Sequence, residues 1–239
     1  MEGLRDIARN AIINHFSQGA IFISAFVLLI SGGKCVKMEG KGKQSNYLKI
    51  GLLWYIISLV VYGILLYVFE EVAILSTFYK ILLLFPIALV LLKRCSWGSI
   101  GFKKPEKPIN WVIPFIIGVP LIAILSRIYI YNQSINAIEL TYPFFLAVLI
   151  APITEEIFFR GFLLERFSKK LSEEIAIVIV ALLFMIVHIP KLAIGVYDPV
   201  NMIFVFVLGY LYGVSYLFGG SLIYPIVFHA LWNLSVSLF

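Results

Sequence analysis

Long apolar runs fill the sequence and constrain its fold more than any other feature. A helix needs about 20 apolar residues to cross the roughly 30 Å hydrocarbon core of a bilayer. We expect eight such helices, at residues 11–31, 50–69, 72–92, 111–131, 143–165, 173–190, 201–218 and 221–239. The second and third are separated by little more than Glu70 and Glu71, which predicts a tight helical hairpin.

The overall composition supports this assignment. Of the residues, 62% are hydrophobic and 13% are charged, and the mean hydropathy is +1.00. A soluble domain is about half apolar and about a quarter charged. We therefore expect an all-α polytopic membrane protein, a bundle of about eight transmembrane helices with any site in its core. Residues 1–239 are expected to form one integral membrane domain, in which 1–142 supply four helices and basic loops and 143–239 form the core.

The basic residues predict the orientation of the chain. The net charge is +6, and most of the 19 Lys and Arg residues fall in three inter-helix stretches, 34–49, 93–107 and 166–170. Basic loops stay cytoplasmic, so we expect a multi-pass protein of the cell membrane with both termini outside and no nucleic-acid partner. Cys35 and Cys95 lie in two of these stretches. We expect them to face a reducing cytoplasm and to form no disulfide.

Few ionisable residues fall inside the predicted helices. Each costs at least about 2.5–3.5 kcal/mol in hydrocarbon unless it finds a partner. They are His15, Lys80, Arg127, Glu155, Glu156, Arg160, Glu165, His188 and His229. Two lie near helix ends, and we expect Lys80 to extend its ammonium group to the interface and His15 to bond a neighbouring helix. The other five call for a specific explanation.

Spacing separates the charges of the segment "APITEEIFFRGFLLERF". Positions i and i+4 share one face of an α-helix, whereas adjacent positions point about 100° apart. Glu156 and Arg160 are therefore expected to form an ion pair. Glu155 has no partner on its own helix, so it must find one on another helix or lose its charge through desolvation.

Two later helices carry candidate partners. The sixth ends in "FMIVH", with Phe184 one turn before His188, and the eighth contains "FHALWN", which puts His229 and Asn233 on one face. Three helices thus carry polar groups suited to a site in the bundle core. Structural roles are open to each: Glu156 with Arg160 as a buried strut, His188 bonded to a backbone carbonyl, and His229 with Asn233 as a link between helices.

These residues form three ordered motifs, EExxxR, FxxxH and HxxxN, and with them the chain resembles the CAAX protease and bacteriocin-processing family of intramembrane endopeptidases. The resemblance covers about 143–239. It implies hydrolysis of a peptide bond inside the membrane. By the same resemblance Glu155 and His188 activate a water, and His229 and Asn233 stabilise the oxyanion. Arg160 with Glu156 would preorganise the site, and Phe184 would support it.

The resemblance implies no cofactor. A zinc site is the chemical alternative, because Glu155, His188 and His229 could supply two His ligands and one Glu with an open position for water. The chain lacks HExxH, which argues against zinc.

Two other functions stay open at this point. The same polar residues could hold together a non-enzymatic immunity or partner-binding protein, or a transporter could use Glu155 for proton coupling. The absence of matching interrupted helices argues against the transporter. The expected partners of an endopeptidase are the lipid bilayer and a membrane-associated peptide or protein substrate, prenylated or not.

Overall fold

The computed structural model describes residues 41–69, 72–85, 87, 97–105 and 112–239. Its described residues form helices and connecting loops, with no strand among them. The predicted all-α class is therefore confirmed for this part of the chain. The predicted helix 11–31, with His15, and the two cysteines lie outside the described residues.

The predicted hairpin is present as α2 (Lys41–Phe69) and α3 (Val72–Leu83). The helix α2 begins nine residues before the predicted start at residue 50. The two helices are joined by the stacked rings of Tyr62 and Tyr79, 4.8 Å apart, and by Trp54, whose Nε1 donates to the carbonyl oxygen of Leu82 at 2.7 Å.

A short turn of 3-10 helix, η1 (Trp97–Ile100), precedes α5 (Val112–Tyr129), which nearly coincides with the predicted helix 111–131. The helix α5 packs against the last helix, α12 (Ile223–Val236). The rings of Phe115 and Phe228 meet edge to face at 5.6 Å in this contact.

Residues 142–167 form one helical rod whose hydrogen-bond pattern changes along its length. It consists of α6 (Tyr142–Phe145), the π-helical η2 (Leu146–Ile150), α7 (Ala151–Glu156), the π-helical η3 (Ile157–Leu164) and α8 (Glu165–Phe167). Glu155 and Glu156 end the α-helical turns between two π-helical segments. Wide turns of this kind occur often at functional sites.

Three helices complete the described fold together with the short α10 (Ile189–Ala193). They are α9 (Glu173–Ile186), α11 (Pro199–Gly219) and α12. Ser172 caps α9 by accepting from the backbone N–H of Ile175, and Asp198 caps α11 by accepting from that of Asn201. Gly220 ends α11 with a left-handed φ of 65°, a conformation that glycine adopts without a Cβ clash.

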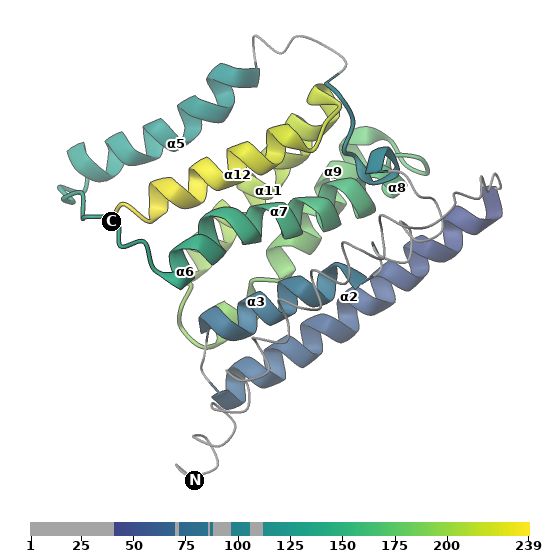
Figure 1. The fold of residues 1–239 in the computed structure, drawn as a ribbon, viewed down its shortest axis with the longest axis horizontal. Coiled ribbons are helices and arrows are strands. Elements are labelled where there is room, and N and C mark those ends of the chain that lie inside the picture. The colour runs from purple at the N-terminus through teal and green to yellow at the C-terminus, as the bar shows by residue number, and fades with distance from the viewer. Residues whose placement is uncertain (1–40, 70–71, 86, 88–96, 106–111) are drawn as a thin grey trace.

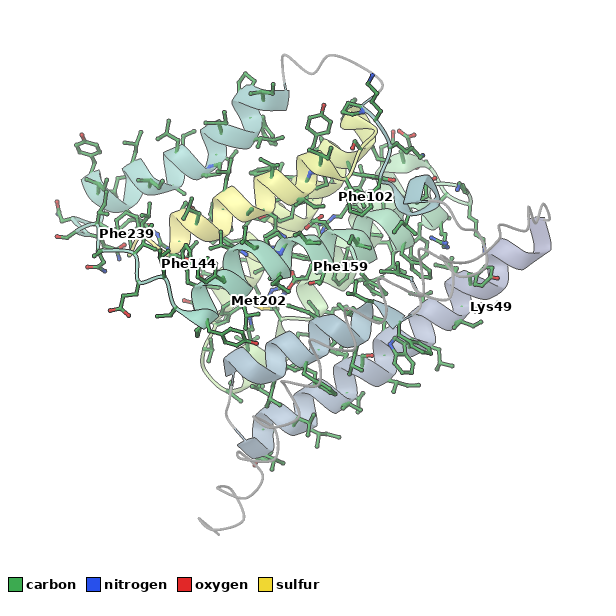
Figure 2. The ribbon with its side chains drawn as sticks, in the orientation of Figure 1. Lys49, Phe102, Phe144, Phe159, Met202 and Phe239 are labelled. Carbon is green, nitrogen blue, oxygen red and sulfur yellow. The ribbon has the colours of Figure 1, made fainter. Side chains whose placement is uncertain are left out.

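Figure 1 shows the arrangement of these helices. The helices α5, α12, the 142–167 rod, α3 and α2 follow one another across the bundle, and α9 and α11 lie behind them. Figure 2 shows Phe159, a fully buried ring, near the middle of this bundle. The rod at 142–167 therefore packs against elements from both halves of the chain.

Four helices in the described part are long and apolar enough to cross a membrane: Tyr47–Val68, Tyr142–Phe167, Glu173–Ala193 and Pro199–Gly219. Two apolar helices are shorter, at Ile113–Tyr129 and Ile223–Val236. The predicted count of eight is therefore not confirmed. The outward faces are apolar, as Leu53 at 60% and Ile203 at 63% exposure illustrate, which suits contact with lipid.

Candidate active site

A buried ion pair stands at the centre of the polar cluster. Glu156 Oε1 accepts a hydrogen bond from Arg160 Nη1 at 2.9 Å, and both side chains are 0% exposed. The pair predicted from the i, i+4 spacing is therefore present. The same Oε1 lies 2.9 Å from His229 Nδ1. Because an ionised carboxylate only accepts hydrogen bonds, the Nδ1–H of His229 is the donor.

Arg160 extends this cluster to a further helix. Its Nη2 donates to the carbonyl oxygen of Gly209 on α11 at 2.6 Å, and its guanidinium lies 4.8 Å from the centre of the Phe184 ring. A Cβ on Gly209 would lie 3.0 Å from that ring. The glycine thus lets α11 approach closely enough to accept from the arginine.

Glu155 points away from this pair, as its position on the helix predicted. Its Oε1 lies 3.5 Å from Lys80 Nζ, and its Oε2 lies 3.9 Å from His229 Nε2. The expectation that Lys80 reaches the membrane interface is therefore wrong. Its side chain is only 12% exposed, because α3 packs against α7 and directs the lysine inward. The sequence signal was present, since a lysine deep in an apolar helix requires an anion.

His188 lies where α9 gives way to α10. Its Nδ1 is 2.9 Å from the carbonyl oxygen of Phe184, so Nδ1 carries the hydrogen and Nε2 is left as an acceptor. Its ring stacks on Tyr197 at 5.7 Å. No hydrogen bond joins it to Glu155 in the described residues, although the two side chains interact electrostatically. The contact with a backbone carbonyl, one of the two roles open from sequence, is the one observed.

Asn233 and His229 link α12 to two different neighbours. The Asn233 Nδ2 donates to the carbonyl oxygen of Ala147 in η2 at 2.7 Å. The His229 ring stacks on Tyr212 of α11 with centroids 4.7 Å apart. Both residues therefore join helices. Of the two, His229 is the one whose ring lies close to Glu155. Tyr212 was not predicted, because its position in an aromatic-rich helix looks like ordinary core packing.

The three residues of the alternative zinc site do not form a ligand cluster. Among the residues that the structure describes, no group of three or more His, Cys, Asp or Glu side chains is arranged to hold a metal ion. Glu155 has a lysine ammonium group beside it instead.

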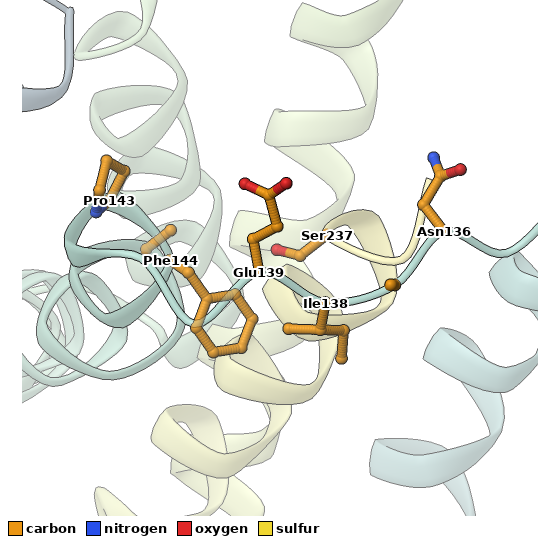
Figure 3. A pocket seen from close by; sticks show the side chains of 8 residues that line it. Asn136, Ile138, Glu139, Pro143, Phe144 and Ser237 are labelled. Carbon is orange, nitrogen blue, oxygen red and sulfur yellow. The ribbon is translucent and has the colours of Figure 1, made fainter.

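A pocket of about 670 Å³ opens between the loop before α6 and the end of α12. Figure 3 shows Glu139, Phe144 and Ser237 around it. Ala147, whose carbonyl binds Asn233, also lines the pocket. The pocket therefore shares Ala147 with the Asn233 contact, and Asn233 itself is not among its lining residues.

Comparison with protein families matches residues 137–235 to the family described as type II CAAX prenyl endopeptidase Rce1-like. This is a protease family of membranes, and the matched range contains all three motifs. The resemblance stated from the sequence is therefore confirmed. Neither the comparison with curated proteins nor that with solved structures found a match.

Proposed function

We propose, from the match of residues 137–235 to a family of CAAX prenyl endopeptidases, that the chain is an intramembrane endopeptidase. One observation carries the proposal: Glu155 lies in an apolar core without a partner on its own helix, and its Oε2 faces an imidazole nitrogen at 3.9 Å. Its neighbour Glu156 is already paired with Arg160. Glu155 takes no part in that pair, and a carboxylate positioned in this way can act as a base.

The proposed reaction uses a water molecule held by Glu155 and His188. Glu155 Oε2 takes one proton from the water while the water oxygen attacks the carbonyl carbon of the scissile bond. The proton is then delivered to the leaving nitrogen as the C–N bond breaks. Atoms and charge balance, and the carboxylate is regenerated without a cofactor.

The tetrahedral intermediate carries an oxyanion, for which His229 and Asn233 are the proposed donors. One such donor is worth about 3–4 kcal/mol. The amide of Asn233 has two N–H groups, so one of them is available after the bond to Ala147. The Nδ1–H of His229 already donates to Glu156, and its Nε2 faces Glu155. Nε2 can therefore donate to the oxyanion only in the imidazolium form, in which both ring nitrogens carry a hydrogen.

In this proposal Glu156 and Arg160 are supporting residues. The pair holds the imidazole of His229 in one orientation, since Oε1 accepts from both Nη1 and Nδ1. Phe184 supports the same arrangement, because its ring lies against both Arg160 and His229. Fixed orientation of this kind accounts for much of enzymatic rate enhancement.

The proposed substrate is a membrane-associated peptide or protein. The family description names a CAAX prenyl endopeptidase, so a prenylated tail is one substrate to test, and a non-prenylated membrane peptide is the other. We place the protein in the cell membrane with its basic loops in the cytoplasm, following the distribution of Lys and Arg.

Comparison of membrane proteomes tests the function. Cells with the native protein are compared with cells carrying Glu155→Gln, and with Glu165→Gln as the matched control. Glu165 lies on the same rod, at the end that is more exposed, and its Oε1 is 3.0 Å from Lys169 Nζ. We expect one or more precursors to accumulate with Glu155→Gln alone. The opposite outcome is an unchanged proteome, with cells carrying Glu155→Gln keeping the phenotype of cells with the native protein. That result would assign a non-enzymatic immunity or partner-binding role.

A further inference from the structure

The two oxygens of Glu155 have different neighbours. Oε1 faces the ammonium group of Lys80 at 3.5 Å, and Oε2 faces His229 Nε2 at 3.9 Å. Both side chains of the lysine–glutamate pair are nearly enclosed, at 12% and 9% exposure. The carboxylate is therefore held from one side and left open to reacting groups on the other.

Lys80 comes from a part of the chain outside the family match. That match begins at residue 137, whereas Lys80 lies on α3. A hydrophobic stripe of Leu75, Tyr79 and Leu83 fixes this helix, since all three are buried at successive turns. The stacked pair of Tyr62 and Tyr79 sets the rotation of α3 against α2. The position of the ammonium group is thus set by packing of the hairpin.

Stability is a weak explanation for this lysine. A buried ion pair is often no more stable than apolar side chains of similar volume. Glu155 also has His229 and Lys191 within electrostatic range, so Lys80 is not its sole source of positive charge. What Lys80 adds is a contact to one particular oxygen.

We propose that Lys80 is a positioning residue for Glu155, and that the α2–α3 hairpin is part of the active site. Lys80 holds Oε1 throughout the reaction and takes no proton, so that Oε2 keeps facing the water that it deprotonates. The inference rests on the proposed function, because it assigns Glu155 the role of base. It predicts that the hairpin is needed for catalysis as well as for membrane insertion.

Activity of single variants tests the role. The native protein and the variants Lys80→Met, Lys80→Arg and Lys103→Met are purified whole and reconstituted in phosphatidylcholine–phosphatidylglycerol vesicles with the precursor that Glu155→Gln accumulates. Lys103→Met is the matched control, because Lys103 also pairs with a glutamate of the rod, at 3.7 Å, but is 41% exposed. We expect Lys80→Met to lower kcat by up to about 100-fold with little change in KM.

Lys80→Arg keeps the positive charge and should recover most of kcat, and Lys103→Met should retain native kcat. Full activity of Lys80→Met overturns the proposal. A loss that Lys80→Arg does not recover, and that follows the fraction of folded protein, shows a structural role only and also overturns it.

A thermal cycle separates this proposal from the function on which it rests. Unfolding midpoints are measured for Lys80→Met, Glu155→Gln and the double variant. If the two side chains pair, the double variant loses less than the sum of the single changes, because each single change leaves one buried charge alone. Additive losses overturn the pairing. Coupled midpoints without an accumulated precursor would overturn the proposed function, and the positioning role with it, while leaving the ion pair established.

Discussion

Glu156 and His229, 73 residues apart in the chain, are joined by a 2.9 Å hydrogen bond in which the ring Nδ1–H donates to Oε1. The bond connects the 142–167 rod with α12. It also sets the free nitrogen of the imidazole toward Glu155. The carboxylate of Glu156 thus determines the orientation of the His229 imidazole, which faces the carboxylate of Glu155.

The first prediction concerns the buried cation at the centre of this network. Arg160→Met removes the guanidinium from the fully enclosed Glu156, which keeps its hydrogen bond from His229. We expect a loss of about 3–5 kcal/mol in the free energy of unfolding, measured by thermal or denaturant unfolding in detergent. Arg160→Met combined with Glu156→Gln should recover much of this loss. Equal instability of the double variant would show that the arginine acts through its contacts with Gly209 and the aromatic rings.

The second prediction separates two roles of Asn233. Asn233→Ala removes the donor to the carbonyl oxygen of Ala147, which should cost about 1–3 kcal/mol of stability. If the amide also stabilises the oxyanion, kcat should fall by about 100- to 1000-fold in the protein that remains folded. Activity per folded molecule near the native value would restrict Asn233 to joining helices.

The third prediction concerns a close approach of two backbones. A Cβ on Gly161 in η3 would overlap the carbonyl oxygen of Ile100, so Gly161→Ala should destabilise the protein by about 1–3 kcal/mol. Gly118 in α5 is the control, since no atom of the described residues lies within 4 Å of a Cβ there. Gly118→Ala should raise stability by about 1 kcal/mol through helix propensity. Unfolding midpoints compare the two, and equal effects would contradict the predicted overlap.

The fourth prediction concerns metal removal. Glu155 has Lys80 beside Oε1, and a cation in that place competes with a metal ion. We expect cleavage of the precursor to continue unchanged after treatment with a strong chelator. Loss of cleavage that added zinc restores would instead support the ligand set of Glu155, His188 and His229.

The fifth prediction tests the orientation of the chain. Cys35 and Cys95 fall in two of the basic stretches that we expect in the cytoplasm. A membrane-impermeant maleimide should label neither in intact cells and both after permeabilisation. Labelling of either cysteine in intact cells would reverse the topology of its loop.

The sequence by itself determined the helical class and most residues of the polar cluster, but not the parts that Lys80 and Tyr212 play in it. Apolar runs of about 20 residues predict helices in a membrane, and most of the observed helices begin and end near the predicted positions. The number of crossings was less predictable. The helices at Ile113–Tyr129 and Ile223–Val236 are shorter than full spans. Their lengths could not be predicted, because composition alone does not show where a helix ends inside an apolar run.

Contacts within one helix were also predictable, since a period of 3.6 residues puts Glu156 beside Arg160. Contacts between helices were not. Only the tertiary structure decided that Lys80 meets Glu155 and that Asn233 meets Ala147. The physical reason is that spacing along a helix determines which face a side chain occupies, whereas the packing of helices determines what that face meets. In an apolar core, where an unpaired charge is costly, that packing determines the partner of Glu155.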